Sequence, residues 1–333
     1  MLTSKLAGRP ILATSWPLAA AFTALLIGAL TFDEELFFLL NQMAAFQPLF
    51  WLHLTHLGEV LVAVATFGIF VGTHPRLLWS LAISIILSVL IVQGLKHVVA
   101  APRPPAVLAV DQIQVIVPTT RVLHEADPNI NYEDFVNSRP DYATSWQKIQ
   151  SDPNSREARY WIPRMSDTVT KEQFGIALYH ETLDLERGTY IGIYRPSVRS
   201  FPSGHTATIA CALSLLMVYF GKLRYAWGLA LLAVAVGCSR VVVGVHWPLD
   251  VAVGGLVGWT VAIAGTWLAY RWAFTSKKIG HWAITLLPIA AALTLLAREP
   301  VYPEIAVFET LIGVGSLALT AAGLWRLYTR KFV

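Results

Sequence analysis

Charged residues are scarce in this chain. Only 14% of its 333 residues are Asp, Glu, Lys or Arg, whereas 55% are hydrophobic. An ordinary soluble domain carries about 25% charged residues. A long chain with so few charges cannot coat a water-facing surface, which argues against a soluble enzyme, a disordered scaffold or a nucleic-acid-binding module. The composition therefore predicts a polytopic membrane protein.

Cysteine and net charge are low as well. The two cysteines, Cys211 and Cys238, both lie in apolar runs, which argues against a disulfide framework. The 25 basic residues exceed the 21 acidic ones by a formal charge of only +4. This excess is too small to indicate a polyanionic partner such as a nucleic acid.

Long apolar runs are what the chain has instead. A transmembrane helix needs about 20 mostly apolar residues. The first run follows Lys5 and Arg9 but has no small-x-small cleavage site, so we expect an uncleaved anchor rather than a signal peptide. The sequence predicts eight membrane helices, over residues 12–32, 54–73, 77–99, 204–220, 225–243, 248–270, 281–297 and 305–327.

Basic residues between these runs set the expected orientation. The loop expected after the first helix contains Asp33, Glu34 and Glu35 and no base. Because Lys and Arg concentrate in cytoplasmic segments, we expect both termini in the cytoplasm and the protein in the cytoplasmic (inner) membrane. The bases that share the side of the N-terminus are Lys5, Arg9, Arg76, Lys222, Arg224, Arg271, Lys277, Lys278, Arg326, Arg330 and Lys331.

A polar segment interrupts the helices. Residues 105–200 contain 13 acidic and 10 basic residues and are too polar to span a membrane. By helix parity this insert lies on the extracytoplasmic side. The expected division is 1–104 with helices one to three, 105–200 as the insert, 201–272 with helices four to six, and 273–333 with helices seven and eight.

Three polar clusters occur at the extracytoplasmic ends of predicted helices. Ionisable residues at membrane depth are costly, so each is a candidate functional residue. Helix parity brings all three clusters to one membrane face. They are Lys96 with Arg103-Pro104, Pro202-Ser203-Gly204-His205, and Ser239-Arg240 followed by His246 and Asp250.

These residue types suit phosphate chemistry. Arginine forks match phosphate oxygens, and Ser203-Gly204 at a helix start offers an anion site. His246 and Asp250 are four residues apart on one helix face, where a carboxylate fixes the imidazole tautomer. The constellation indicates phosphoryl transfer through a covalent histidine intermediate.

The spacing resembles the signature of the type-2 phosphatidic-acid phosphatase family, which shares its site with vanadium haloperoxidases. The matching segments are Lys96-x6-Arg103-Pro104, Pro202-Ser203-Gly204-His205 and Ser239-Arg240-x5-His246-x3-Asp250, with no departure at a signature position. The resemblance implies an all-α membrane fold with a six-helix phosphatase core. The insert and two extra C-terminal helices lie outside it.

The resemblance also implies the roles of these residues. His246 would attack phosphorus, Asp250 would orient it, and His205 would protonate the leaving oxygen. Water would then hydrolyse the phosphohistidine without a metal or another cofactor. The residues expected to hold the phosphoryl oxygens are Lys96, Arg103, Ser203, Gly204 and Arg240.

The membrane setting favours a lipid substrate such as phosphatidylglycerophosphate, phosphatidate or undecaprenyl pyrophosphate. Arg195 and Arg199, shortly before Pro202, are candidates for contact with its headgroup. A lipid phosphotransferase would use the same histidine and stays open. An anion transporter is less favoured because the charges gather at one face rather than at mid-depth.

Overall fold

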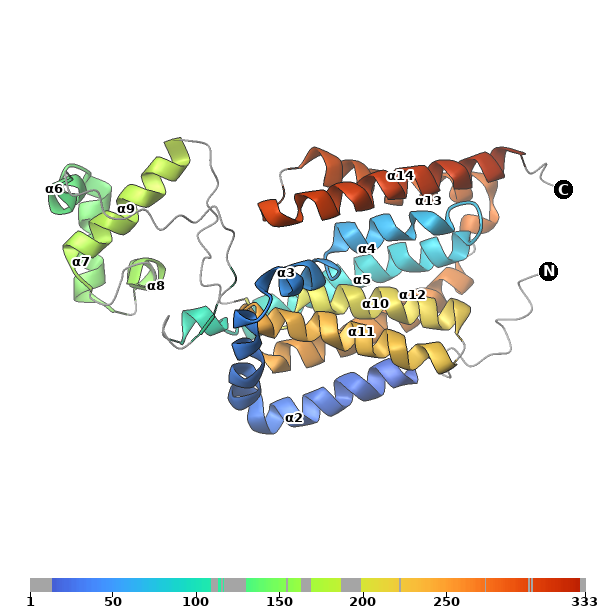
Figure 1. Cartoon of the computed structure of the whole chain (residues 1–333), viewed down its shortest axis with the longest axis horizontal. Helices are drawn as coiled ribbons and strands as arrows, with labels where there is room; N and C mark the ends of the chain where they lie inside the picture. Colours follow the sequence, from blue (N-terminus) through green and yellow to red (C-terminus); the bar gives the residue numbers. More distant parts are fainter. Residues whose placement is uncertain are drawn as a thin grey trace.

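The computed structural model describes residues 14–108, 113–114, 116, 130–153, 155–162, 169–186, 199–221, 223–272, 274–298, 300 and 302–329. The regular structure in these residues is helical, with no strand among them. Long helices form one bundle, and a small group of shorter helices lies at one end of it (Figure 1). The expected all-α polytopic membrane fold is confirmed.

The bundle contains nearly all of the apolar helices that the sequence predicts. Five of them, α5, α11, α12, α13 and α14, are long and apolar enough to cross a membrane. Helix α3, together with α4 and the following turn, is a bent pair with the length and composition of one further span. Helix α10 is apolar but has only 17 residues. The bounds are α2 Trp16–Asn41, α3 Pro48–His56, α4 Val60–Thr66, α5 Pro75–Val99, α10 Gly204–Phe220, α11 Leu223–Val242, α12 Pro248–Arg271, α13 Lys278–Ala297 and α14 Ala306–Thr329.

The span expected over 54–73 is not one continuous helix. Helices α3 and α4 are bent by 66° at a break that contains Gly58 and Glu59. A Cβ on Gly58 would lie 2.9 Å from the Cβ of His205, so the chain at the break packs directly against α10. Glu59 is ion-paired with Arg298. Apolar periodicity contains no sign of these two tertiary contacts, which is why the prediction was wrong.

The acidic loop expected after the first helix is also absent. Helix α2 continues to Asn41 and takes Asp33, Glu34 and Glu35 into its second half, beyond a kink at Phe32 (φ −135°, ψ 40°). Asp33 Oδ1 accepts a hydrogen bond of 2.8 Å from the backbone N–H of Leu249, in the first turn of α12. The carboxylate therefore fastens two helices together rather than lying in a connecting loop.

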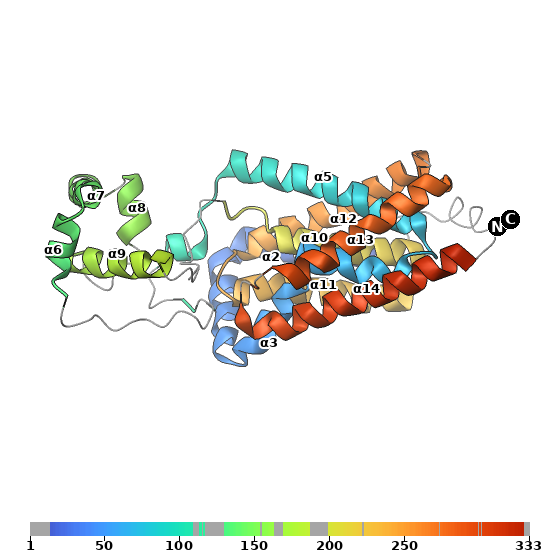
Figure 2. The same ribbon diagram turned by 90° about the horizontal axis from the view of Figure 1, so that it is seen from above.

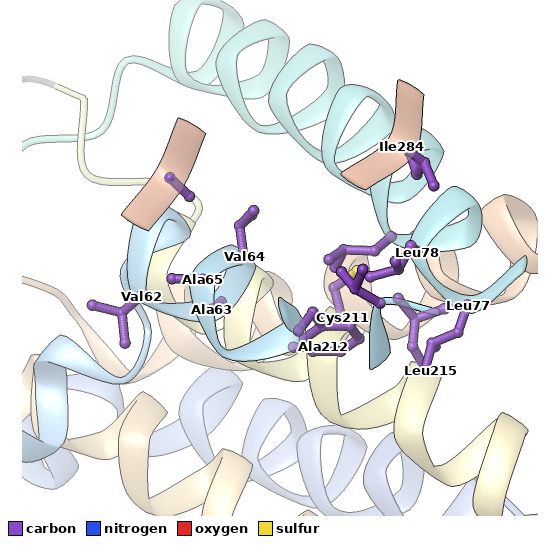
Figure 3. Packing of buried hydrophobic residues seen from close by; sticks show 14 of the residues in the cluster. Val62, Ala63, Val64, Ala65, Leu77, Leu78, Cys211, Ala212, Leu215 and Ile284 are labelled. Carbon is purple, nitrogen blue, oxygen red and sulfur yellow. The ribbon is translucent and has the colours of Figure 1, made fainter. Parts of the chain in front are cut away.

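Helix α12 lies at the centre of the bundle, against α10, α5 and α2. Its glycines allow the close approach, because a Cβ on Gly254 would lie 2.5 Å from the backbone oxygen of Ser203. A second layer joins α13 to this core. Figure 3 shows Val62 and Ala65 of α4 in the same apolar cluster as Leu78 of α5 and Ile284 of α13.

The shorter helices belong to the insert. Their bounds are α6 Tyr132–Asn137, α7 Pro140–Ser151, α8 Arg156–Trp161 and α9 Lys171–Glu186. They have an apolar core of their own, which includes Trp146, Trp161 and Phe174. Asn131 and Ser155 cap the starts of α6 and α8. Figures 1 and 2 place this group beyond the bundle end at which α5 ends and α10 and α12 begin.

Candidate active site

The three polar clusters predicted from the sequence meet at one end of the bundle. The backbone N–H of Ser203 donates to the Asp250 carbonyl at 2.9 Å, which joins the start of α10 to α12. The Trp247 indole N–H donates to the Pro102 carbonyl at 3.0 Å and ties in the segment after α5. Side chains more than a hundred positions apart in the sequence therefore share one site.

A histidine–carboxylate pair lies at the centre of this site. His246 Nδ1 is 3.1 Å from Asp250 Oδ2, and both residues are 2% exposed. The same carboxylate oxygen accepts the backbone N–H of Trp247 at 2.9 Å. With Nδ1 donating to the carboxylate, the lone pair of Nε2 is left available as a nucleophile.

Ser200 completes the pair, and sequence reasoning missed it. Its buried hydroxyl donates a short hydrogen bond to Asp250 Oδ2 and lies 3.4 Å from His246 Nδ1. Its backbone N–H donates to the Ala101 carbonyl at 2.9 Å, which brings the two ends of the insert together. The only signal in the sequence was its place two residues before Pro202.

Lys96, Arg103 and Arg240 place three positive charges around the pair. Lys96 Nζ donates to the carbonyl oxygens of Arg199 and Ser200 at 2.7 and 3.3 Å. Arg240 Nη1 donates to Thr55 Oγ1 at 2.9 Å, so α3 also contributes to the site.

The electrostatics favour a neutral histidine. Burial, followed by the positive charges of Arg103, Arg240 and Lys96, lowers the pKa of His246 well below its ordinary value. The imidazole therefore keeps its lone pair beside a cationic site that attracts an anion.

The start of α10 contributes a cap and a second histidine. Ser203 is fully buried, and its Oγ accepts hydrogen bonds from the backbone N–H and the hydroxyl of Thr206, at 3.4 and 2.9 Å. Gly204 and the half-buried His205 follow in the first turn of the helix. The positive end of the helix dipole thus lies beside the cationic cluster.

A cavity of about 320 Å³ opens beside His205. Helices α4, α5 and α10 line it, mostly with apolar side chains such as Leu61, Leu81, Ile85 and Val89. Its volume and lining suit a hydrocarbon chain better than a polar ligand.

Of the two residues expected to contact the headgroup, the structure describes only Arg199. Arg195 lies outside the described residues, so its position is a prediction still. The side chain of Arg199 is exposed, and its backbone carbonyl oxygen accepts the hydrogen bond from Lys96 Nζ.

Comparison with known proteins yields one family and several partial relatives. Residues 77–278, more than half of the chain, match the family model described as the PAP2 superfamily. That range contains all three polar clusters. No solved structure matches the chain at a significant level.

Three curated proteins are similar to part of the chain. They are the bacitracin transport permease protein BcrC of Bacillus licheniformis (41% identical, 24% of this chain and 38% of that protein), the undecaprenyl-diphosphatase of Sulfolobus acidocaldarius (42%, 21% and 34%) and the phosphatidylglycerophosphatase B of Escherichia coli (37%, 22% and 30%). The chain thus spans about a third of the length of these relatives.

Proposed function

Since the chain belongs to the PAP2 superfamily, we propose that it is a membrane hydrolase that removes phosphate from a lipid phosphate or diphosphate. The observation that carries this proposal is the buried His246–Asp250 pair among Lys96, Arg103 and Arg240. A neutral imidazole held by a carboxylate and surrounded by cations suits nucleophilic attack on a phosphoryl group.

The proposed reaction has two steps. His246 Nε2 attacks phosphorus, and the bond from phosphorus to the lipid oxygen breaks with its electron pair on that oxygen. His205 donates the proton that neutralises the leaving oxygen. Water then attacks the phosphohistidine, the bond from phosphorus to Nε2 breaks with its electron pair on His246, and the proton that the water loses returns to His205 as phosphate is released. The cations perform the charge neutralisation that magnesium performs in kinases, so the reaction as proposed needs no metal.

The substrate we propose is an amphiphile whose phosphate enters the cationic site. The apolar cavity beside His205 supports this, because it offers a place for the first part of a lipid chain next to the leaving oxygen. Two of the similar proteins are named for undecaprenyl diphosphate and phosphatidylglycerophosphate. Phosphatidylglycerophosphate, phosphatidate and undecaprenyl pyrophosphate are therefore the substrates to test first.

We place the site at the extracytoplasmic face of the cytoplasmic membrane. Helix α2 begins and α14 ends at the bundle end opposite the insert, as Figure 1 shows. Arg76 and Arg271 lie at this same end, at the start of α5 and the end of α12. An end that carries bases in short connections is the cytoplasmic one by the positive-inside rule.

The test is phosphate release by the protein purified in detergent, without vesicles. We expect His246→Ala to abolish release and also to abolish acid-labile labelling of the protein by a radiolabelled lipid phosphate. His281→Ala, in α13, is the matched control and should retain both. Activity of the His246→Ala protein equal to wild type would overturn the proposal, and transfer of label to an added alcohol would identify a phosphotransferase instead.

A further inference from the structure

A partly buried ion-pair network joins the break between α3 and α4 to the C-terminal helix pair. Arg298, at the end of α13, donates from Nη2 to Glu59 Oε2 at 2.7 Å and to Glu309 Oε1 at 2.6 Å. Its Nη1 donates to the other oxygen of Glu59. Glu309 is 2% exposed, whereas the side chains of Arg298 and Glu59 are 25% and 18% exposed, so the network reaches from the interior to the edge of the bundle.

His56 is the fourth member of this network. Its Nε2 lies 3.8 Å from a carboxylate oxygen of both Glu59 and Glu309. Two carboxylates and an imidazole have the spacing of a metal site. However, the guanidinium of Arg298 already bridges the two carboxylates, so a divalent cation would have to expel a bidentate arginine. The cluster is thus built as an ion-pair network.

The network adjoins the residue proposed as the general acid. Gly58, next in the chain to Glu59, packs so closely on His205 that an added Cβ would lie 2.9 Å from both the Cβ and the carbonyl oxygen of His205. Glu59 and His205 also line the same cavity. The backbone that Arg298 fixes through Glu59 is therefore the surface against which His205 is held.

We propose that Arg298 is a positioning residue for His205, acting through Glu59 and Gly58. This inference rests on the proposed function, in which His205 donates an N–H proton to the leaving oxygen as its bond to phosphorus breaks. Proton transfer depends steeply on the placement of the donor, so a small shift of α10 against the break slows it.

The proposal gives the C-terminal helix pair a part in the reaction. The family match ends at residue 278, and α13 and α14 occupy 278–297 and 306–329. Arg298 and Glu309, from the end of one helix and the start of the next, reach back to the core at the break. Helices α13 and α14 thus hold the break between α3 and α4 in place on the leaving-group side of the site.

The experiment compares two substrates that have alkyl chains of the same length and differ in their leaving groups. Dodecyl phosphate releases an alkoxide and needs the acid, whereas a nitrophenyl phosphate carrying the same alkyl chain releases a stable phenolate and does not. The variants are Arg298→Lys, which keeps the charge and loses the fork, and Glu309→Gln, which keeps the shape. Glu157→Gln, from the Lys148–Glu157 ion pair of the insert, is the matched control.

We expect Arg298→Lys to lower kcat for dodecyl phosphate about tenfold and kcat for the nitrophenyl substrate less than twofold, because general acid catalysis contributes about 100-fold or more in full. Rates are normalised to the phosphohistidine formed at saturation with the nitrophenyl substrate, whose leaving group needs no acid, which removes misfolded protein from the comparison. Glu309→Gln should show the same split, and Glu157→Gln should show neither loss.

Two outcomes would overturn the inference: an equal loss on both substrates, or no loss on either. His246→Ala tests the proposed function separately in the same assay. If that variant keeps full activity, the proposed function fails. If it is inactive while Arg298→Lys affects both substrates equally, only the positioning role of Arg298 fails.

Discussion

The Ser200 hydroxyl donates a hydrogen bond to the same oxygen of Asp250 that lies 3.1 Å from His246 Nδ1. The carboxylate is therefore held from two sides, by the loop before α10 and by the loop before α12. Its position, and with it the direction of the His246 ring, depends on a residue outside the three polar clusters.

Replacing Ser200 tests this dependence. Ser200→Ala removes one hydrogen bond to a charged group, which contributes about 1.5–3 kcal/mol. We expect a fall in kcat of about tenfold with KM nearly unchanged, because the serine orients the pair and does not hold the lipid. Steady-state kinetics on phosphatidate check this, with Ser138→Ala in the insert as control. Wild-type kcat in Ser200→Ala would contradict the role.

The pH dependence follows from the lowered pKa of His246. A histidine protonates below about pH 6.5 in its ordinary state, and protonation removes the nucleophilic lone pair. Because the pKa is lowered, the neutral ring persists at more acidic pH, so protonation of His246 should not limit phosphohistidine formation as the pH falls through 6.5.

The variant Arg103→Gln tests whether the acid limb of the pH profile reports the protonation of His246. Losing a positive charge near His246 raises its pKa, and the acid limb of the profile should move to higher pH. Rapid-quench measurement of phosphohistidine formation from pH 4 to 8 follows both proteins. A limb that stays in place, or moves to lower pH, would show that His246 does not carry it.

Filling the cavity beside His205 should weaken binding of long lipid chains. Val89 lines the cavity, whereas Val98, on the same helix, is 83% exposed and does not. We expect Val89→Trp to raise KM for a long-chain lipid phosphate about tenfold and to change KM for a short-chain ester little, since lost burial of a few methylenes amounts to about 1–3 kcal/mol. Val98→Trp is the control. Equal effects of the two substitutions would place the chain elsewhere.

The tight contact of Gly58, at the break between α3 and α4, can be tested with Gly94 as the control. Gly58 has His205 against it, whereas a Cβ on Gly94 in α5 would meet nothing within 4 Å. Gly58→Ala should lower stability by about 1–3 kcal/mol through overpacking and reduce kcat. Gly94→Ala should stabilise the helix by about 0.5–1 kcal/mol and leave turnover unchanged. Thermal unfolding in detergent and turnover together check this. Identical behaviour of the two variants would show that the contact of Gly58 with His205 affects neither stability nor turnover.

The centre of the site can be predicted from the sequence because the residues that form it are close together along the chain. His246 and Asp250 are four residues apart at a helix start, and that spacing alone places their side chains together. The apolar runs predict most helices for the same reason. The contact of Arg298 with Glu59 joins residues 239 positions apart, and no periodicity encodes it. The bend at Gly58, the bond from Ser200 and the attachment of Asp33 to α12 likewise depend on which helices meet.

The hydrogen bond from Ser200 N to the Ala101 carbonyl closes the base of the insert. The chain therefore leaves the bundle and returns to it at neighbouring positions. Among the described residues of the insert, Gln114 and Ile116 also bond to Asn41 and Val243 of the bundle. The helices α6 to α9 lie beyond these contacts, so a change in their length need not alter the path of the chain through the core. Ser200 itself cannot be moved, because it also binds Asp250.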